Sequence, residues 1–403
     1  MTLKPVFRPV FVIALLGWLV AFGFIAELVL PNLVTRGIGF AYRQVGLASP
    51  FAQGRMLIEE PVETLEFEFT FHPFEDLPTR RPAALLGDGP ETFFVAERRA
   101  PLIRETEFQS FLDEEGFDIA TDERTGLLDV IVVDGAYFAS LVLTEGDCVF
   151  VALYDVQARE LVDRFPCFDA SEHEINPNVT GGAWLADGGW VYRATGIGQT
   201  QTWTRQNLAA QDPDSPYGKV LRYRIDRAGA GVKLVEREVF TSGHRNPQGM
   251  AKIGDQIVLI EHGARGGDEI NVLKEGGNYG WPLATFGGAY TFYSIPPDPG
   301  TIENLVLPAH SFAPAIAPAN VAPCPSRIAV EYEGFDCMIL AALRAEAFFI
   351  VIADFARNKV FSVEKVPTGL RTRRVRLVDD TLYFAPEKAH VFRADIADMQ
   401  ASE

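Results

Sequence analysis

Three polar, glycine-rich segments lying close together in the chain carry the side chains best suited to chemistry. They read Gly-His-Arg-Asn-Pro-Gln-Gly at 243–249, Glu-His-Gly-Ala-Arg-Gly-Gly-Asp-Glu-Ile-Asn at 261–271 and Gly-Gly-Asn-Tyr-Gly-Trp-Pro at 276–282. A short apolar run, Ile257–Ile260, separates the first two, a pattern typical of strands alternating with functional loops. Guanidinium, amide, carboxylate and backbone carbonyl groups together are able to hold an anionic cofactor and a hard cation.

The rest of the chain indicates the scaffold that must position these loops. Apolar and polar side chains alternate from Leu65 to Phe71, and Leu127–Val133 and Ala136–Leu143 flank an Asp-Gly turn as a hairpin would. The sequence has 35 Gly, 26 Pro and 30 Phe and shows no long helical periodicity after residue 60, which favours an all-β fold. The roughly 340 residues after residue 60 would divide into about six propeller blades of about 57 residues each. The periodicity alone does not distinguish a β-sandwich from a β-propeller.

Composition and charge exclude several classes of function. The formal net charge is −18, and a polyanion of this kind repels phosphate backbones, so we expect no nucleic-acid partner. The acidity serves solubility or presents a docking face to a basic partner. The sequence contains no P-loop, no GxSxG and no HExxH motif, which argues against the corresponding nucleotide, hydrolase and zinc chemistries.

The three polar segments, together with Ala210–Arg222, resemble the signature of the glucose/sorbosone dehydrogenases, the soluble pyrroloquinoline quinone (PQQ) sugar dehydrogenases. Weaker similarity runs to the C-terminus, whereas residues 1–170 show almost none. The resemblance implies an all-β, six-bladed β-propeller over residues 61–403.

The resemblance also implies which residues would bind PQQ. Arg245 and Asn246 would contact cofactor and substrate, with Gln248 beside them, and Arg344 stands where the family has a cofactor-binding lysine.

A second arginine segment, 371–375, resembles the family's Arg-x-Arg-Asp-Val. Arg371 and Arg373 would face the carboxylates of PQQ, and Arg374 stands where an acid is usual. The alternative is that this arginine run is a solvated edge strand, because charged side chains commonly protect sheet edges.

Two calcium sites are implied by the same resemblance. The backbone carbonyls of Gly263 and Ala264 correspond to ligands of a calcium ion at the quinone, although the family's proline is absent from this turn. Glu269 and the region of Tyr279 correspond to a second, structural calcium site. The alternative is that Glu269 and its neighbour Asp268 only cap turns and pair with Arg265.

The largest departure from the family concerns the general base. The family's catalytic histidine would fall within Ile175–Trp184, a segment without histidine. Pro177, Asn178 or Val179 takes its place, and none of these side chains accepts a proton near neutral pH. His173, a few residues upstream, would require a rearranged loop to serve as the base.

Four cysteines bear on the compartment. None is in a Cys-x-x-Cys pair and no histidines cluster near them, so a zinc site is not expected. An even number fits disulfides formed in an oxidising compartment. We expect the local pairs Cys148–Cys167 and Cys324–Cys337, and the alternative is four buried free thiols.

The N-terminus predicts a membrane anchor. Residues 9–30 form an apolar run of about the length that spans a bilayer, and no convincing cleavage site precedes Pro31, which favours a signal anchor over a cleaved signal peptide. Residues 1–8 would be cytoplasmic and 31–60 a juxtamembrane linker. The bulk of the chain would lie in the periplasm, or more generally outside the cytoplasm.

Two classes of function follow. In the first, the propeller has kept the scaffold but lost dehydrogenase catalysis, and acts as a membrane-anchored docking subunit, a pseudoenzyme within an integral-membrane complex. In the second, it is an active PQQ- and calcium-dependent aldose dehydrogenase with a sugar substrate and a substitute base, His173 or Glu174. The missing base and the predicted anchor favour the first.

Overall fold

The computed structural model describes residues 62–63, 67–87, 94–97, 118–119, 126–200, 204–228, 231–288 and 302–398. All of them belong to one compact unit, Leu57–Glu403, of the two into which the chain divides. The predicted cytoplasmic segment 1–8, anchor 9–30 and nearly all of the linker 31–60 fall in the other unit, and the whole of 1–60 lies outside the described residues. No helix in the described part of the chain is long and apolar enough to cross a bilayer.

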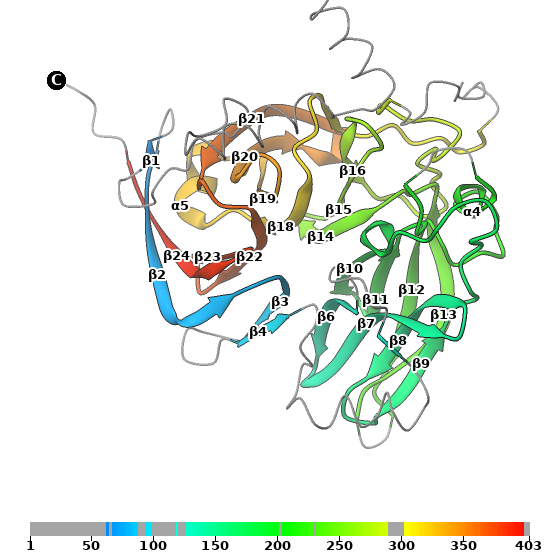
Figure 1. Cartoon of the computed structure of the whole chain (residues 1–403). Coiled ribbons are helices and arrows are strands. Elements are labelled where there is room, and N and C mark those ends of the chain that lie inside the picture. Colours follow the sequence, from blue (N-terminus) through cyan, green and yellow to red (C-terminus); the bar gives the residue numbers. More distant parts are fainter. Residues whose placement is uncertain are drawn as a thin grey trace, which may run out of the picture. The chain divides into compact units, whose positions relative to one another are not determined.

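Antiparallel sheets make up almost all of the described unit, which confirms the all-β prediction (Figure 1). Three sheets are four-stranded meanders that run in chain order. The first contains β10 (Gly181–Asp187), β11 (Trp190–Thr195), β12 (Lys219–Asp226) and β13 (Lys233–Ser242). The second contains β14 (Pro247–Ile253), β15 (Gln256–Glu261), β16 (Asp268–Val272) and β17 (His310–Phe312). The third contains β18 (Pro318–Pro323), β19 (Asp336–Ala342), β20 (Ala347–Asp354) and β21 (Lys359–Pro367).

Three further sheets complete the described unit. One five-stranded sheet contains β5 (Asp118–Ile119), β6 (Leu127–Val133), β7 (Ala136–Glu145), β8 (Cys148–Asp155) and β9 (Glu160–Arg164). The other five-stranded sheet contains β1 (Val62–Glu63), β2 (Phe67–Thr79), β24 (Ala389–Asp398), β23 (Thr381–Pro386) and β22 (Thr372–Val378). A two-stranded sheet contains β3 (Pro82–Leu86) and β4 (Phe94–Glu97). The predicted hairpin is confirmed as β6 and β7.

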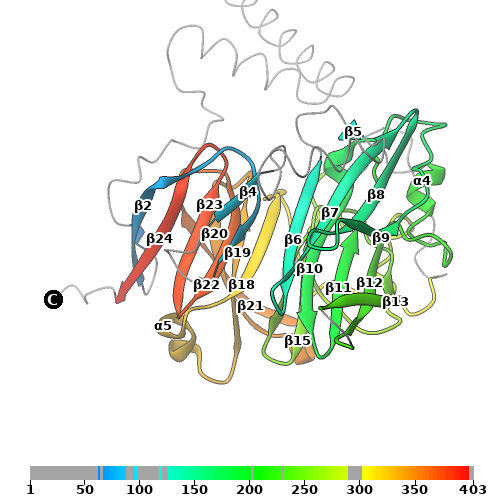
Figure 2. The same ribbon diagram turned by 90° about the horizontal axis from the view of Figure 1, so that it is seen from below.

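The inner strands of successive sheets pack side by side around a common centre (Figures 1 and 2). Contacts link β3 to β6, β6 to β10, β10 to β14, β14 to β18, β18 to β22 and β22 back to β3. This closed ring is the arrangement of a β-propeller and excludes a two-layer sandwich. Because propeller sheets meet face to face around the ring, the loops at the ends of these inner strands converge near the axis.

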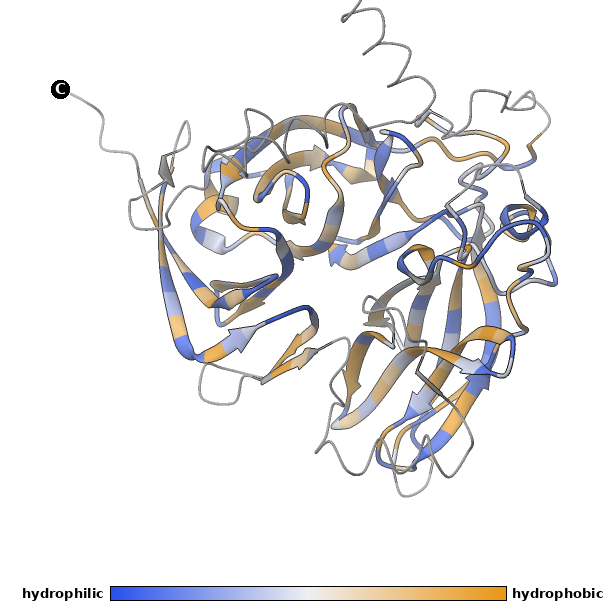
Figure 3. Ribbon diagram, in the orientation of Figure 1, coloured by the Kyte–Doolittle hydropathy of each residue, from blue (hydrophilic) through white to orange (hydrophobic). Residues whose placement is uncertain are grey.

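The two ends of the described unit join in one sheet. β2 pairs antiparallel with the C-terminal strand β24, with Phe69 opposite Ile396, so early and late parts of the chain share hydrogen bonds that close the ring. The predicted period of two is confirmed in β2, where Phe67, Phe69 and Phe71 are buried. Phe71 packs edge to face on Phe384 at 5.2 Å between ring centroids. Figure 3 shows this alternation of hydrophobic and hydrophilic residues along most strands.

Short α and 3₁₀ segments connect the strands. They are η2 (Pro177–Val179), α4 (Arg205–Leu208), α5 (Ser326–Ala329), η4 (Val330–Tyr332) and η5 (Phe355–Arg357). α4 begins at Thr204, whose hydroxyl accepts a hydrogen bond from the backbone N–H of Asn207, the contact expected of an N-cap.

Both predicted disulfides are present, and the alternative of four free thiols is wrong. Cys148 pairs with Cys167 and Cys324 pairs with Cys337, with Cα–Cα distances of 5.3 and 5.4 Å. The first ties the start of β8 to the segment after β9, and the second ties the segment after β18 to β19. Each bond therefore cross-links neighbouring strands of one sheet.

Candidate functional site

A cavity of about 370 Å³ lies where loops from several sheets converge. Its polar lining carries three guanidinium groups, two asparagine amides, a glutamine, a histidine and a carboxylate. The lining residues are Arg81, Asn176, Asn178, Gln248, His262, Ala317, Leu343, Arg371, Arg373 and Glu387. They come from the turn between β2 and β3, the segment at η2, and the ends of β14, β15, β18, β19, β22 and β23.

One wall of the cavity is an arginine–carboxylate cluster. Nε of Arg371 donates to Glu387 at 2.8 Å, and Nε of Arg373 donates to the same carboxylate at 3.0 Å. Burial by itself would raise the pKa of Glu387, but the charge of Arg373 and the hydrogen bonds from both arginines lower it to about 2. Glu387 therefore stays ionised at physiological pH. Burial lowers the pKa of Arg373, yet a guanidinium remains charged in proteins.

The structure brings together half of the predicted PQQ contacts. Gln248, Arg371 and Arg373 line one cavity although the last two lie more than a hundred residues beyond the first. Arg344 is exposed and is not among the lining residues.

Two residues that line the cavity, Arg81 and Glu387, belong to no motif that the sequence offers. Arg81 lies in the divergent first part of the chain, outside any motif, and Glu387 follows β23 without a recognisable pattern. Each lies at the end of a strand of one sheet, Arg81 after β2 and Glu387 after β23. The spacing of Glu387 behind the arginine run was the available signal, because antiparallel pairing of β22 with β23 sets Thr372 opposite Pro386.

Asn246 does not line the cavity but links the loops around it. Its Nδ2 donates to the backbone carbonyl of Asn178 at 3.1 Å and contacts Nδ1 of His262 at 3.2 Å. Its Oδ1 accepts from the backbone N–H of Gly181 at 3.2 Å and from Nε2 of Gln248 at 2.9 Å. Both protons and both lone pairs of the amide are thus engaged within the protein. In this structure the side chain connects three segments: its own loop, the segment from η2 to β10, and the turn after β15.

Arg245 is also turned into the protein. Nη1 donates to the carbonyl of Gly263 at 2.6 Å and to that of His262 at 3.3 Å. The guanidinium carbon lies 5.2 Å from the centre of the Trp281 ring, a favourable cation–π distance. Only 5% of the residue is exposed. Arg245 therefore contacts the turn that the resemblance assigns to calcium.

The turn at 262–264 is tightly built. A Cβ on Gly263 would lie 2.2 Å from the carbonyl oxygen of Gly266, so only glycine fits. The backbone N–H of Gly263 donates to Oδ1 of Asp268 at 3.0 Å, and Oδ2 of Asp268 accepts from the N–H groups of Ile316 and Ala317 at 2.8 and 2.7 Å. Asp268 thus acts as a turn cap, and Ala264 packs in the core.

His262 faces the cavity with a defined tautomer. Its Nε2 lies 2.8 Å from the carbonyl of Pro318, which can only accept, so Nε2 carries the proton. Nδ1 is then the acceptor for Asn246. Burial, with a smaller opposing effect of Asp268, lowers the pKa of His262, which is consistent with a neutral ring.

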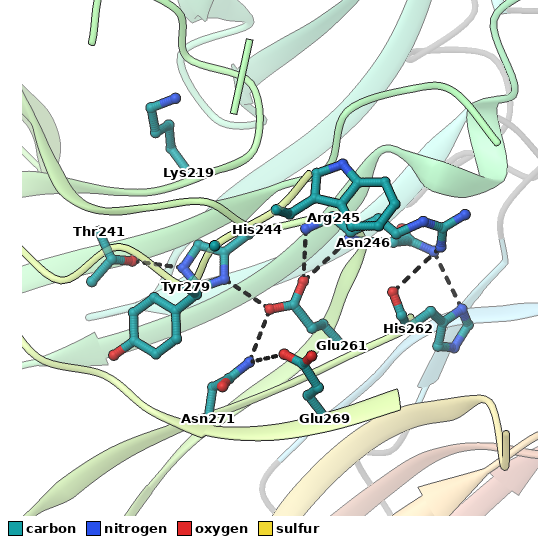
Figure 4. A network of polar contacts seen from close by, with 12 residues as sticks. Lys219, Thr241, His244, Arg245, Asn246, Glu261, His262, Glu269, Asn271 and Tyr279 are labelled. Carbon is teal, nitrogen blue, oxygen red and sulfur yellow. Dashed lines mark hydrogen bonds and ion pairs between the residues drawn. The ribbon is translucent and has the colours of Figure 1, made fainter. Parts of the chain in front are cut away.

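A buried polar network underlies the Arg245–Asn246 turn (Figure 4). Oε2 of Glu261 accepts from the backbone N–H of Arg245 at 2.7 Å, and Oε1 accepts from Nδ1 of His244 and Nδ2 of Asn271, both at 2.9 Å. Asn271 also donates to Glu269 at 3.1 Å. Burial first, and then the charge of Glu261, raise the pKa of Glu269 well above its ordinary value. Glu261 therefore holds in place the turn that carries Arg245.

At the second predicted calcium site, the described side chains do not form a cluster of acidic groups. The hydroxyl of Tyr279 donates to the carbonyl of Val272 at 2.6 Å and accepts from the N–H of Lys274 at 2.9 Å, and its ring stacks on His244 at 4.7 Å. The described residues contain no group of three histidine, cysteine, aspartate or glutamate side chains placed to hold a metal. Calcium at Glu269 and Tyr279 stays a prediction.

Two asparagines line the wall of the cavity where the family resemblance places the general base. Oδ1 of Asn176 accepts from the backbone and the side-chain amide of Asn178 at 3.1 and 2.8 Å, and both residues line the cavity. His173 is exposed and is not among the lining residues, and its carbonyl accepts a hydrogen bond from Gln199. The cavity thus presents amides at this wall.

The amino-acid sequence is similar to sugar dehydrogenases of known families. A family model described as Glucose / Sorbosone dehydrogenase matches residues 79–391. The aldose sugar dehydrogenase YliI of Escherichia coli is 39% identical over 139 residues, which are 31% of this chain and 34% of that protein. Quinoprotein glucose dehydrogenase B of Acinetobacter calcoaceticus is 39% identical over 101 residues, 23% of this chain and 21% of that protein. The aligned part thus spans about a third or less of the curated relatives.

Solved structures share the fold. The soluble aldose sugar dehydrogenase of Escherichia coli in its apo-form superposes with a TM-score of 0.60 at 23% identity, covering 82% of this chain and 100% of that one. The PQQ-bound aldose sugar dehydrogenase of Streptomyces coelicolor gives a TM-score of 0.54 at 17% identity, covering 82% and 98%. The family match extends over most of the chain and the propeller agrees with it, so this protein belongs to the glucose/sorbosone dehydrogenase family.

Proposed function

We propose that the propeller binds an anionic cofactor of the PQQ class in its cavity and serves as an extracytoplasmic docking subunit with little or no sugar oxidation. The observation that carries the proposal is the convergence of Arg81, Arg371 and Arg373 on one cavity. Guanidinium groups are the preferred partners of carboxylates, because they form strong, directional, charge-assisted hydrogen bonds.

The charge of the lining suits such a ligand. Three guanidinium groups and the single carboxylate of Glu387 leave two net positive charges around the cavity, with His262 neutral. PQQ is a flat tricarboxylate, so Arg371 and Arg373 would hold its carboxylates and Gln248 would orient it. When bound, its ortho-quinone would supply the acceptor for the hydride of a sugar oxidation, and that hydride carries both electrons. The chain's own part would be to bind and orient this group.

The lack of a proton acceptor supports weak or absent catalysis. A dehydrogenase of this type must remove the proton of the sugar's hydroxyl as hydride leaves, and a general base must lie within hydrogen-bond reach of that proton. Asn176 and Asn178 occupy the relevant wall, and His173 lies on the surface. An amide does not accept a proton near neutral pH, so binding without efficient turnover is the expected behaviour.

Cofactor binding is tested by titrating PQQ into the purified protein and following tryptophan fluorescence and the quinone absorbance. Saturable binding is expected, and Arg373→Met should weaken it by about a hundredfold because it removes a buried charge-assisted contact. Arg357→Met is the matched control, since Arg357 pairs with Asp354 on the surface. Equal affinities of the wild type and both variants would contradict the assignment of the cavity.

The second candidate is an active PQQ-dependent aldose dehydrogenase. It is favoured by the placement of Gln248, Arg371 and Arg373 around one cavity, and it needs a substitute base such as His173 or Glu174. Dye reduction over a panel of aldoses with the PQQ-loaded protein distinguishes the two. Turnover at rates of about 1 s⁻¹ or more, within the common range of enzymes, would favour the dehydrogenase and overturn the docking role.

We also infer that the propeller has six blades. In support, β3 and β4 lie between β22 and β6 in the ring of inner strands, where a sixth blade would stand. An experimental structure of the full chain tests this inference. Five complete sheets around the axis, with no further strand beside β3 and β4, would contradict it.

The proposed location is a membrane-anchored position outside the cytoplasm. The apolar run at 9–30 and the two disulfides support it, because structural disulfides persist in oxidising compartments. A docking subunit would join an integral-membrane protein complex through this anchor. Membrane fractionation followed by protease treatment of intact spheroplasts tests the topology, and recovery of the full chain in the cytosolic fraction would contradict it.

A further inference from the structure

We propose that the interface between two neighbouring sheets holds a small monatomic anion such as chloride, bound by the guanidinium of Arg193 and the indole N–H of Trp184. The interface lies between the sheet that contains β7 and the sheet that contains β11, which stand next to each other in the ring (Figure 2). Neither residue is among those that line the cavity, so this inference does not depend on the proposed cofactor.

Arg193 is a fully buried charge in an apolar environment. It lies on β11, with 0% of the residue exposed. Its guanidinium carbon lies 5.0 Å from the centre of the Phe165 ring and 5.5 Å from that of the Trp184 ring. Both rings belong to the hydrophobic core that the two sheets share. The charge has therefore exchanged water for aromatic rings, whose cation–π attraction replaces only part of its hydration.

Among the described residues, no carboxylate forms an ion pair with Arg193, whose Nη2 donates to Oγ of Ser140 at 2.6 Å. The nearby carboxylate of Asp163 is already engaged, because it accepts from Nη1 of Arg237 at 2.9 and 3.1 Å and from the hydroxyl of Tyr223 at 2.9 Å. Burial lowers the pKa of Arg193, with a smaller opposing effect of Asp163, yet a guanidinium remains charged in proteins. A buried cation of this kind requires a counter-charge.

Three buried donors of this cluster have no acceptor in the described part of the chain. They are Nε and Nη1 of Arg193 and Nε1 of Trp184. None of these groups is able to accept a hydrogen bond, and an unpaired buried donor destabilises the fold. A monatomic anion accepts from all three donors, whereas a water molecule accepts from at most two and brings two protons that need acceptors of their own. The donor set therefore favours an anion.

The setting also limits the size of the anion. Protein interiors leave few voids larger than a water molecule, and the guanidinium of Arg193 is packed against aromatic rings. A polyatomic anion such as phosphate or sulfate carries more acceptor positions than the three donors satisfy, whereas a halide is a single atom. An ion that binds only the folded chain stabilises it by mass action, so the stability of the protein should depend on the chloride concentration at fixed ionic strength.

The experiment follows thermal unfolding of the full chain in sodium chloride and in sodium gluconate at equal ionic strength. Chloride should raise the unfolding midpoint of the wild type by about 3 °C or more, and crystals soaked in sodium bromide should show an anomalous peak against Nε and Nη1 of Arg193. Arg193→Met removes the charge but keeps an apolar chain against Phe165, so it should lose both the shift and the peak. Arg224→Met is the matched control and should keep both, because Arg224 lies on the adjacent strand β12, is partly exposed and pairs with Glu236.

Trp184→Phe tests the third donor and decides the matter if Arg193→Met does not fold. It keeps an aromatic ring against the guanidinium but removes the indole N–H, and should raise the chloride concentration for half-maximal stabilisation by about tenfold, the loss expected for one hydrogen bond to a charged group. The proposal is overturned if the wild type and every variant that folds show the same chloride dependence, or if the density beside Arg193 carries no bromide signal. These readouts need no PQQ, so their failure is distinguishable from a failure of cofactor binding.

Discussion

The carboxylate of Glu387 accepts a hydrogen bond from Nε of Arg373 at 3.0 Å on the wall of the cavity. Arg373 is largely buried, with 11% of its side chain exposed, and Glu387 is similarly shielded at 14%. The pair therefore sets both the charge of the cavity and part of the stability of the sheet that closes the ring.

Replacing Glu387 by Gln should tighten the binding of PQQ. The change raises the net charge of the cavity lining from two to three positive charges and frees both arginines for a ligand carboxylate. We expect an increase in affinity of about tenfold at low salt, corresponding to about 1.4 kcal/mol, and a smaller increase at high salt. Fluorescence titration measures it, with Glu331→Gln as a control in an exposed pair with Arg327. Weaker binding by Glu387→Gln would show that the carboxylate positions the arginines for the ligand.

The stability of the protein should fall in acid partly through Glu387. Its pKa in the folded protein is about 2, below the ordinary 4.5, so the ionised carboxylate favours the folded state. This contribution is fully present above about pH 4.5 and is lost as the pH falls towards 2, with an upper limit of about 3 kcal/mol. Urea unfolding across that range should show a smaller pH dependence in Glu387→Gln. An unchanged pH dependence would mean that other carboxylates dominate acid unfolding.

Replacing Asn246 by Ala should destabilise the fold more than a typical surface change. The substitution leaves the carbonyl of Asn178, the N–H of Gly181, Nδ1 of His262 and Nε2 of Gln248 with one partner fewer each. We expect a loss of about 2–4 kcal/mol in the free energy of unfolding, because buried groups lose their hydrogen bonds. Urea denaturation measures it, and Glu333→Ala, at an exposed position, provides a comparison in which no such buried set of hydrogen bonds is broken.

Restoring a histidine at the wall of the cavity should raise sugar oxidation. In Asn178→His, an imidazole with an ordinary pKa near 6.5 would supply a proton acceptor where the wild type has an amide. We expect the rate of dye reduction by the PQQ-loaded variant to rise by about a hundredfold for some aldose, the gain typical of a positioned base. His173→Ala should leave the rate unchanged, because His173 lies outside the cavity lining. A loss of activity in His173→Ala would instead support the substitute base.

The sequence by itself determined the elements and the local links of this protein. The alternation of Phe67, Phe69 and Phe71 predicted a strand with one buried face, since side chains on a strand alternate between the two faces of the sheet. The pairs Cys148–Cys167 and Cys324–Cys337 followed from short separations within neighbouring strands. The motif residues Gln248, Arg371 and Arg373 could be assigned to one site because their types and order resemble a family pattern.

Only the tertiary structure decided which side chains face the cavity and which face the protein. Arg245 and Asn246 are neighbours in the most recognisable motif, yet both side chains bind other parts of the protein. Arg245 donates to the carbonyl of Gly263, and Asn246 binds the backbone of Asn178 and Gly181. Arg81 and Glu387, far apart in sequence, line the same cavity. The physical reason is that the direction of a loop side chain depends on the carbonyls and amides that ring closure brings within hydrogen-bond distance. The partners of Asn246 at Asn178 and Gly181 lie at the start of a neighbouring sheet, where the local pattern of the chain carries no information about them.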